Sequence, residues 1–135
     1  MKDVQLPLVT IVLLSLFACR GGGDPSALKL VQEQRSGDYT VRLLSETGTI
    51  KQGSSGYTLE FLNKADNQLA DVGAVEVAPV MDMPGMGPMM GAAEVKATST
   101  PGRYEVRGNL SMGGLWKMDV RFGAGQKARF TVNAE

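Results

Sequence analysis

Apolar and polar residues alternate with a period of two along most of the chain after residue 28. This period places successive side chains on opposite faces of a β-strand. In the clearest run, Trp116 to Phe122, the apolar residues alternate with Lys, Asp and Arg. No window of helical length has a sustained apolar stripe. The predicted strands are centred on residues 39–43, 57–61, 75–77, 93–97, 104–106, 116–122 and 128–132, with a weaker candidate at 28–34.

Residues that favour turns separate these runs. They lie at 53–56, 63–67, 101–102, 113–114 and 123–125, and are rich in glycine, asparagine and proline. Seven or eight short strands, each with one polar face, are typical of two antiparallel sheets packed face to face. We therefore predict an all-β, immunoglobulin-like antiparallel β-sandwich. A small barrel is the alternative.

The N-terminal segment has a different pattern. Residues 6–17 are almost wholly apolar, too short to span a bilayer but suited to a signal peptide. The run ends in Leu-Phe-Ala-Cys, which resembles the lipobox of bacterial lipoproteins, where the cysteine is acylated and the chain is cleaved on its N-terminal side. We predict a signal peptide over 1–18, an acylated Cys19 with a flexible tether over 19–27, and one sandwich domain over 28–135. The alternative is an ordinary secretory signal or short anchor helix with an incidental cysteine.

An acylated Cys19 would hold the protein on a membrane, because several acyl chains together bind a bilayer firmly. The predicted location is the cell envelope, lipid-anchored and extracytoplasmic, facing the periplasm where there are two membranes. Charge suggests no other partner: 14 basic residues balance 14 acidic ones. The chain also lacks the basic stripe and interleaved aromatic residues of nucleic-acid-binding proteins, so we expect no nucleic-acid partner.

Five methionines fall between residues 81 and 90, in the run Met-Asp-Met-Pro-Gly-Met-Gly-Pro-Met-Met, and the chain has no histidine. Thioether sulfur is a soft, neutral donor that suits Cu(I) or Ag(I). Thioethers carry no proton at ordinary pH, so binding should lack the pH dependence of cysteine or histidine sites. The candidate metal ligands are Met81, Met83, Met86, Met89, Met90 and Met112, and the ring of Trp116 is a candidate cation–π cap.

The same residues have a structural interpretation, because methionine also fills irregular core space and makes apolar contacts. Strand parity places Met81 and Met83 on the core face of the preceding strand, and we interpret Met118 and Trp116 as core residues. The narrower metal hypothesis therefore rests on a Pro/Gly loop, with help from Met81 or Met112. Its main ligands are Met83, Met86, Met89 and Met90.

Three motifs occur in an order that resembles the FixH/YtkA-like domain family. They are a valine strand at 75–80 that runs into the Met-Pro segment, Pro-Gly-Arg-Tyr at 101–104, and Met-Gly-Gly-Leu-Trp at 112–116. The resemblance covers about residues 39–132. It implies an extracytoplasmic, immunoglobulin-like domain linked with copper handling, cation transport or oxidase assembly. The lack of histidine excludes a histidine-assisted metal site in this chain.

Catalysis is the weakest functional hypothesis. Without histidine, and with Cys19 acylated, neither a histidine-based triad nor a cysteine nucleophile is available. The leading hypothesis is a non-catalytic lipoprotein that binds Cu(I) or Ag(I) and serves a metal-efflux or oxidase-assembly membrane complex. The alternatives are an adaptor whose methionine loop contacts a membrane partner, and a structural envelope domain whose loop packs on the core.

Overall fold

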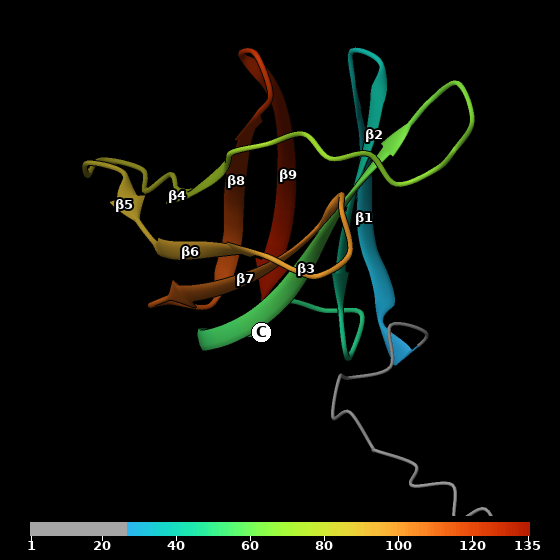
Figure 1. Ribbon diagram of the computed structural model, residues 1–135. Helices are drawn as coiled ribbons and strands as arrows, with labels where there is room; N and C mark the ends of the chain where they lie inside the picture. Colours follow the sequence, from blue (N-terminus) through green and yellow to red (C-terminus); the bar gives the residue numbers. More distant parts are fainter. Residues whose placement is uncertain (1–26) are drawn as a thin grey trace, which may run out of the picture.

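The computed structural model of the chain describes residues 27–135. In this range the chain forms nine strands, which build two antiparallel sheets packed face to face (Figure 1). One sheet has the order β1-β2-β3-β7-β6 and the other β5-β4-β8-β9. The strands are β1 (Lys29–Ser36), β2 (Tyr39–Ser45), β3 (Gly53–Asn63), β4 (Val75–Met81), β5 (Met89–Met90), β6 (Ala92–Ala97), β7 (Arg103–Leu110), β8 (Gly114–Phe122) and β9 (Gln126–Ala134).

The predicted all-β antiparallel sandwich is confirmed, with nine strands in place of seven or eight. Its strand order is immunoglobulin-like: such domains have one sheet ordered A-B-E-D and a second that contains C, F and G. In this chain the A-B-E-D positions are taken by β2, β3, β7 and β6. The C, F and G positions are taken by β4, β8 and β9. β5 extends the second sheet beside β4, and β1 extends the first beside β2. The strands form two separate sheets, so the barrel alternative is wrong.

Inward-facing residues of both sheets fill the space between them. On β8 the buried residues Trp116, Met118 and Val120 alternate with polar neighbours, as the period of two predicted. Trp116 and Met118 are both completely buried, which confirms their interpretation as core residues. The other fully buried hydrophobic side chains of the core include Val41, Leu43, Leu59, Phe61, Val106, Leu110 and Phe130.

β3 is the strand that the sequence pattern placed least well. Residues 53–56 were expected to form a turn, yet β3 begins at Gly53 and pairs with β7 from there to Glu60. Glycine and serine have low intrinsic strand preference, and pairing with a neighbouring strand overrides it here. A glycine on β7 also supports this pairing: a Cβ at Gly108 would lie 3.2 Å from the ring of Tyr57. The short strand β5 was also not predicted.

Gly91 is the point at which the chain passes from one sheet to the other, since β5 pairs with β4 and β6 pairs with β7. The Gly91 N–H donates a hydrogen bond to the carbonyl of Pro79, 2.9 Å away. A Cβ at Gly91 would lie 3.0 Å from the Cβ of Pro79 and 3.1 Å from the carbonyl oxygen of Asn109. A side chain here would force these neighbours to shift by a few tenths of an ångström, so the close approach favours glycine. The corner places β5 at one edge of the sandwich (Figure 1).

The predicted signal peptide, the candidate lipidation site Cys19 and the tether up to residue 26 lie outside the described residues. Within residues 27–135, no helix is both long enough and apolar enough to span a bilayer.

The Tyr57 hydroxyl is buried and has no hydrogen-bond partner within residues 27–135. A buried polar group without a partner costs about 1–3 kcal/mol of desolvation. We therefore expect Tyr57→Phe to raise the free energy of unfolding at pH 7 by about 1 kcal/mol, measured by urea denaturation. Burial also raises the pKa of Tyr57, so stability should fall once the unfolded chain loses this proton above about pH 10. The phenylalanine variant should lose less stability there.

Tyr104→Phe is the matched control for this change. The Tyr104 hydroxyl donates a hydrogen bond to the carbonyl of Gly73, 2.8 Å away, so removing it should destabilise the domain by about 1 kcal/mol at pH 7. We expect the two variants to change the free energy of unfolding in opposite directions. A loss of stability in both would show that the Tyr57 hydroxyl is satisfied in solution.

Candidate metal site

Residues 81–90, here called the methionine hairpin, link β4 to β5 through a tight turn. Val80 pairs with Met90 and Met81 pairs with Met89 across the two strands. At the tip, the Met86 N–H donates to the carbonyl of Met83, 3.1 Å away. Pro84 and Gly85 occupy the two central positions of this turn, and Gly85 has a φ of 75°. Proline followed by a residue with positive φ defines a type II turn.

The register divides the methionines of the hairpin between two faces. Residues directly opposite each other in an antiparallel pair project from the same face, so Met81 and Met89 share the inner face. Met81 is 8% exposed, and Met89 is partly buried and packs against the core. Met90 pairs with Val80 on the outer face and is 64% exposed. Met90 therefore projects away from Met89, its neighbour in sequence.

The turn carries two more methionines, Met83 and Met86. Met83 has the same parity as Met81 and also packs partly buried against the core. Met86 is the fourth residue of the turn that Met83 begins, and the Cα atoms of such residues lie within about 7 Å of each other. Met86 itself is 70% exposed. The hairpin thus has four methionines on the inner face or at the turn, of which Met81 is covered by the core and Met86 faces solvent.

The loop between β7 and β8 lies beside the hairpin. The hydroxyl of Ser111 donates a hydrogen bond to the sulfur of Met89, 3.2 Å away. Next in sequence, the carbonyl of Met112 accepts a hydrogen bond from the indole N–H of Trp116, 3.0 Å away. Met112 is partly exposed, whereas Trp116 is packed inside the core. The Trp116 indole therefore holds this loop from the core side. Because its ring is buried, it offers no exposed surface that could cap a cation.

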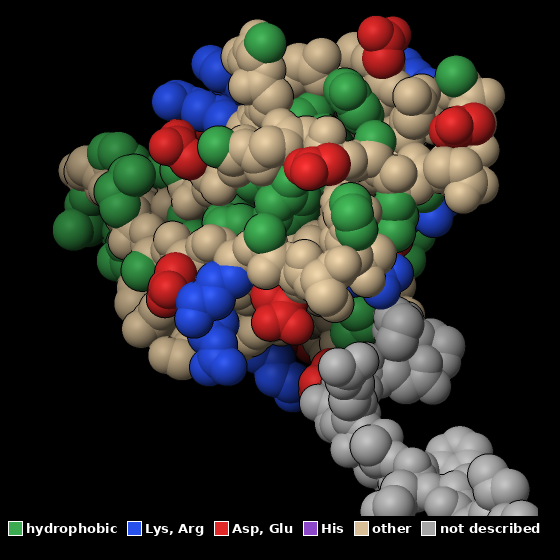
Figure 2. Space-filling model, in the orientation of Figure 1, with side chains coloured by type: hydrophobic (Ala, Val, Ile, Leu, Met, Phe, Trp, Pro, Cys, Tyr) green, Lys and Arg blue, Asp and Glu red, His purple; other side chains and the backbone are tan. Residues whose placement is uncertain are grey.

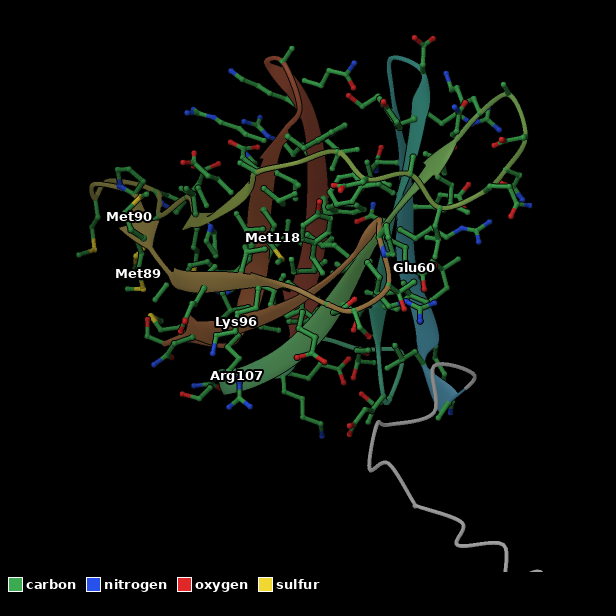
Figure 3. The ribbon with its side chains drawn as sticks, in the orientation of Figure 1. Glu60, Met89, Met90, Lys96, Arg107 and Met118 are labelled. Carbon is green, nitrogen blue, oxygen red and sulfur yellow. The ribbon has the colours of Figure 1, made fainter. Side chains whose placement is uncertain are left out.

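Figure 2 shows hydrophobic side chains gathered at the edge of the molecule where β4 and β5 meet. In Figure 3, Met89 and Met90 lie at this edge, while Met118 lies between the two sheets. Strand parity predicted the core position of Met118 and the inward orientation of Met81. It did not predict that Met90 would be separated from the other hairpin methionines.

One ion pair borders the hairpin. The ammonium of Lys117 contacts the carboxylate of Asp82, the only acidic residue of the methionine hairpin. Farther along the same face, Arg129 hydrogen-bonds to Asp119 and thereby lowers the pKa of that carboxyl. Within residues 27–135, no group of three or more His, Cys, Asp or Glu side chains could hold a metal. A metal site at this edge would therefore depend on thioether ligands.

The Pro-Gly-Arg-Tyr motif positions the segment that leads into β4. The carbonyl of Gly102 accepts a hydrogen bond from the Phe61 N–H, 2.9 Å away. Gly102 lies so close to Ala70 that a Cβ would be 2.7 Å from the Ala70 carbonyl oxygen. Two residues later, Tyr104 bonds to the carbonyl of Gly73, just before β4 begins. The motif thus connects β3, β7 and the start of the strand that carries the hairpin.

A separate groove of about 1120 Å³ lies over β3, β6 and β7. No methionine lines it, so it is distinct from the hairpin. Glu94 and Arg107, which line the groove, are neighbours in register on β6 and β7. At the next outward-facing position, the lining residue Glu105 is opposite Lys96. These alternating charges are typical of a solvated sheet face.

The YtkA-like family model matches residues 33–121, which is more than half of the 135 residues of the chain. No curated protein and no solved structure shows a significant match. The matched range runs from β1 into β8 and includes the methionine hairpin and all three motifs that carried the resemblance. The family predicted from those motifs is confirmed: the chain belongs to the YtkA-like family.

Proposed function

We propose that the protein is a membrane-anchored, extracytoplasmic lipoprotein that binds Cu(I) or Ag(I) through its methionine hairpin, in copper handling or efflux. The observation that supports this proposal most strongly is that one cross-strand pair and one type II turn bring the backbone positions of Met81, Met83, Met86 and Met89 close together. Membership of the YtkA-like family supports an extracytoplasmic domain. Membrane anchorage rests on the Leu-Phe-Ala-Cys sequence that ends at Cys19.

The donor set determines which ions the site would prefer. Thioethers are soft ligands that suit Cu(I), whereas carboxylates and carbonyls suit Mg, Ca and Mn. Neutral ligands also leave the ionic charge uncompensated, which disfavours a divalent ion more than a monovalent one. The first ligands we propose are Met83, Met86 and Met89, because all three reach the surface at least partly. Met81 would support them from the core side. We propose no catalytic role.

The test is a competition titration of the full chain, purified in detergent, against a chromophoric Cu(I) chelator. We expect uptake of one Cu(I) per chain. Because the proposed ligands have no protons to release, the affinity should change by less than about threefold between pH 6 and 8. Absence of uptake would refute the proposal. An affinity that rises about tenfold per pH unit would show that a protonated ligand, and not the thioethers, holds the metal.

An adaptor role is the second candidate function, and one observation favours it. Met86, Met90, Met112 and Leu115 are all exposed, and the loop that carries Met112 contacts the hairpin through the hydrogen bond from Ser111 to Met89. Exposed apolar side chains that lie together often mark a contact surface, and methionine adapts to varied partners. Such an adaptor would bind a membrane partner equally well with copper present or chelated.

A further inference from the structure

The methionines of the described domain differ widely in how far solvent reaches them. Met86 is 70% exposed and Met90 is 64% exposed, whereas Met81 is 8% exposed and Met118 is completely buried. The sulfur of Met89 already accepts a hydrogen bond from the Ser111 hydroxyl. Oxidation of methionine to its sulfoxide requires the oxidant to reach the sulfur, so exposure decides which side chains react. Met86 and Met90 should therefore react first.

Met86 also lies in open surroundings. Its two neighbours in sequence are Gly85 and Gly87, and a Cβ built on either glycine would have no atom within 4 Å. The turn that carries Met86 projects from the edge of the molecule beside β5 (Figure 1). Met90, by contrast, lies on the paired strand β5, next to the closely packed Gly91. A large molecule such as a repair enzyme can therefore enclose the Met86 side chain more easily than that of Met90.

We propose that Met86 is a site of reversible oxidation by hydroperoxides. In the forward step the Met86 sulfur takes one oxygen atom from the hydroperoxide, which leaves as water or an alcohol. The sulfur is oxidised by two electrons and the peroxide bond is reduced by two. In the reverse step two thiols of a methionine sulfoxide reductase supply two electrons, the sulfoxide oxygen leaves as water, and the thiols become a disulfide. Neither step involves a metal.

The fold can accommodate a sulfoxide at Met86. The turn is closed by a backbone hydrogen bond from the Met86 N–H to the Met83 carbonyl, which does not involve the sulfur. At an exposed position the added oxygen stays hydrated, so it carries no desolvation cost. At Met118 the same oxygen would be buried between the sheets, where an unpartnered polar group costs about 1–3 kcal/mol. Oxidation and repair at Met86 therefore require no unfolding.

Oxidation of Met86 would also change which ions the hairpin binds. A sulfoxide oxygen is a harder donor than a thioether sulfur, and soft ions such as Cu(I) favour sulfur. Hydroperoxide would thus lower the Cu(I) affinity of the hairpin, and reduction would restore it. This consequence rests on the proposed function, whereas the modification itself does not.

The test uses the full chain in detergent, with a chelator present to keep it free of metal. NMR of isotope-labelled methionine methyl groups follows each side chain during treatment with excess hydrogen peroxide. Met86 should oxidise within about twofold of its rate in the urea-unfolded chain. Met118 should oxidise at least about a hundredfold more slowly than in the unfolded chain. Reductases for both sulfoxide epimers, supplied with dithiothreitol, should then restore Met86 in the folded chain faster than Met90.

Met86→Leu is the test variant and Met118→Leu is its matched control, because each removes one sulfur and nearly conserves apolar volume. Met86→Leu should lose a fast-reacting signal and Met118→Leu a slow one. Protection of Met86 equal to that of Met118, or repair of Met86 no faster than that of Met90, would overturn the inference. If Met86→Leu failed to fold, the rates in the unmodified chain would still decide the question. Because the chelator excludes metal, failure here leaves the proposed function intact.

Discussion

Replacing Met83, Met86 and Met89 together by leucine should lower the Cu(I) affinity of the chain about a thousandfold. This magnitude assumes that each thioether contributes ~1.4 kcal/mol, which is a tenfold factor in affinity. Leucine has nearly the same volume and apolarity as methionine but offers no donor atom, so the change isolates the sulfur. The measurement is the same competition titration, at a single pH and with the same chelator.

The stability of the domain should change little in this triple variant. Exchanges between leucine and methionine usually cost less than about 1.5 kcal/mol even in a core, and Met86 is mostly exposed. The backbone hydrogen bond that closes the turn, from Met86 to Met83, does not involve the side chains. Urea denaturation of the metal-free protein should therefore give similar midpoints before and after the change.

Met118→Leu is the control for loss of a methionine outside the site. The Met118 side chain is completely buried between the sheets and lies apart from the hairpin (Figure 3). We expect it to leave Cu(I) affinity unchanged while costing up to about 1.5 kcal/mol of stability. Equal affinities for the triple variant and the unmodified chain would exclude the hairpin thioethers as ligands.

At the candidate site, the sequence predicted which methionines face the core by strand parity, but not those whose position depends on pairing register. Strand parity depends only on the period of two, so it correctly placed Met81 on the inner face and Met118 in the core. The position of Met90 depends on pairing register, because a shift of one residue moves a side chain to the opposite face. That register follows from the length of the turn around Pro84 and Gly85. The sequence alone did not show that β5 pairs with β4.

The fold likewise was predictable where it depends on local periodicity, and not where it depends on contacts between distant segments. β8 was predictable because every second residue is apolar and its polar face is solvated. The first residues of β3 are glycine and serine, whose strand conformation depends on pairing with β7, a segment about 50 residues away. The sheet change at Gly91 likewise depends on contacts with Pro79 and Asn109, which sequence periodicity does not report.

Gly102→Ala should destabilise the domain more than the loss of any single methionine sulfur, by about 3–4 kcal/mol in the free energy of unfolding. Gly102 has a φ of 85°, a conformation that costs alanine about 1–2 kcal/mol. The added Cβ would also lie 2.7 Å from the carbonyl oxygen and 2.8 Å from the nitrogen of Ala70. Both neighbours are backbone atoms, so they cannot move aside as a flexible side chain can. Urea denaturation at neutral pH measures the loss.

Gly125→Ala separates the two causes, because this glycine has a nearly identical φ of 88° and no atom within 4 Å of the added Cβ. Gly125→Ala should lower the free energy of unfolding only by the cost of the positive φ, about 1–2 kcal/mol. The difference between the two variants then measures the close packing of β7 against the segment that leads into β4. If both variants lost the same stability, the contact at Ala70 would relax without cost, and glycine would be required at residue 102 only for its positive φ.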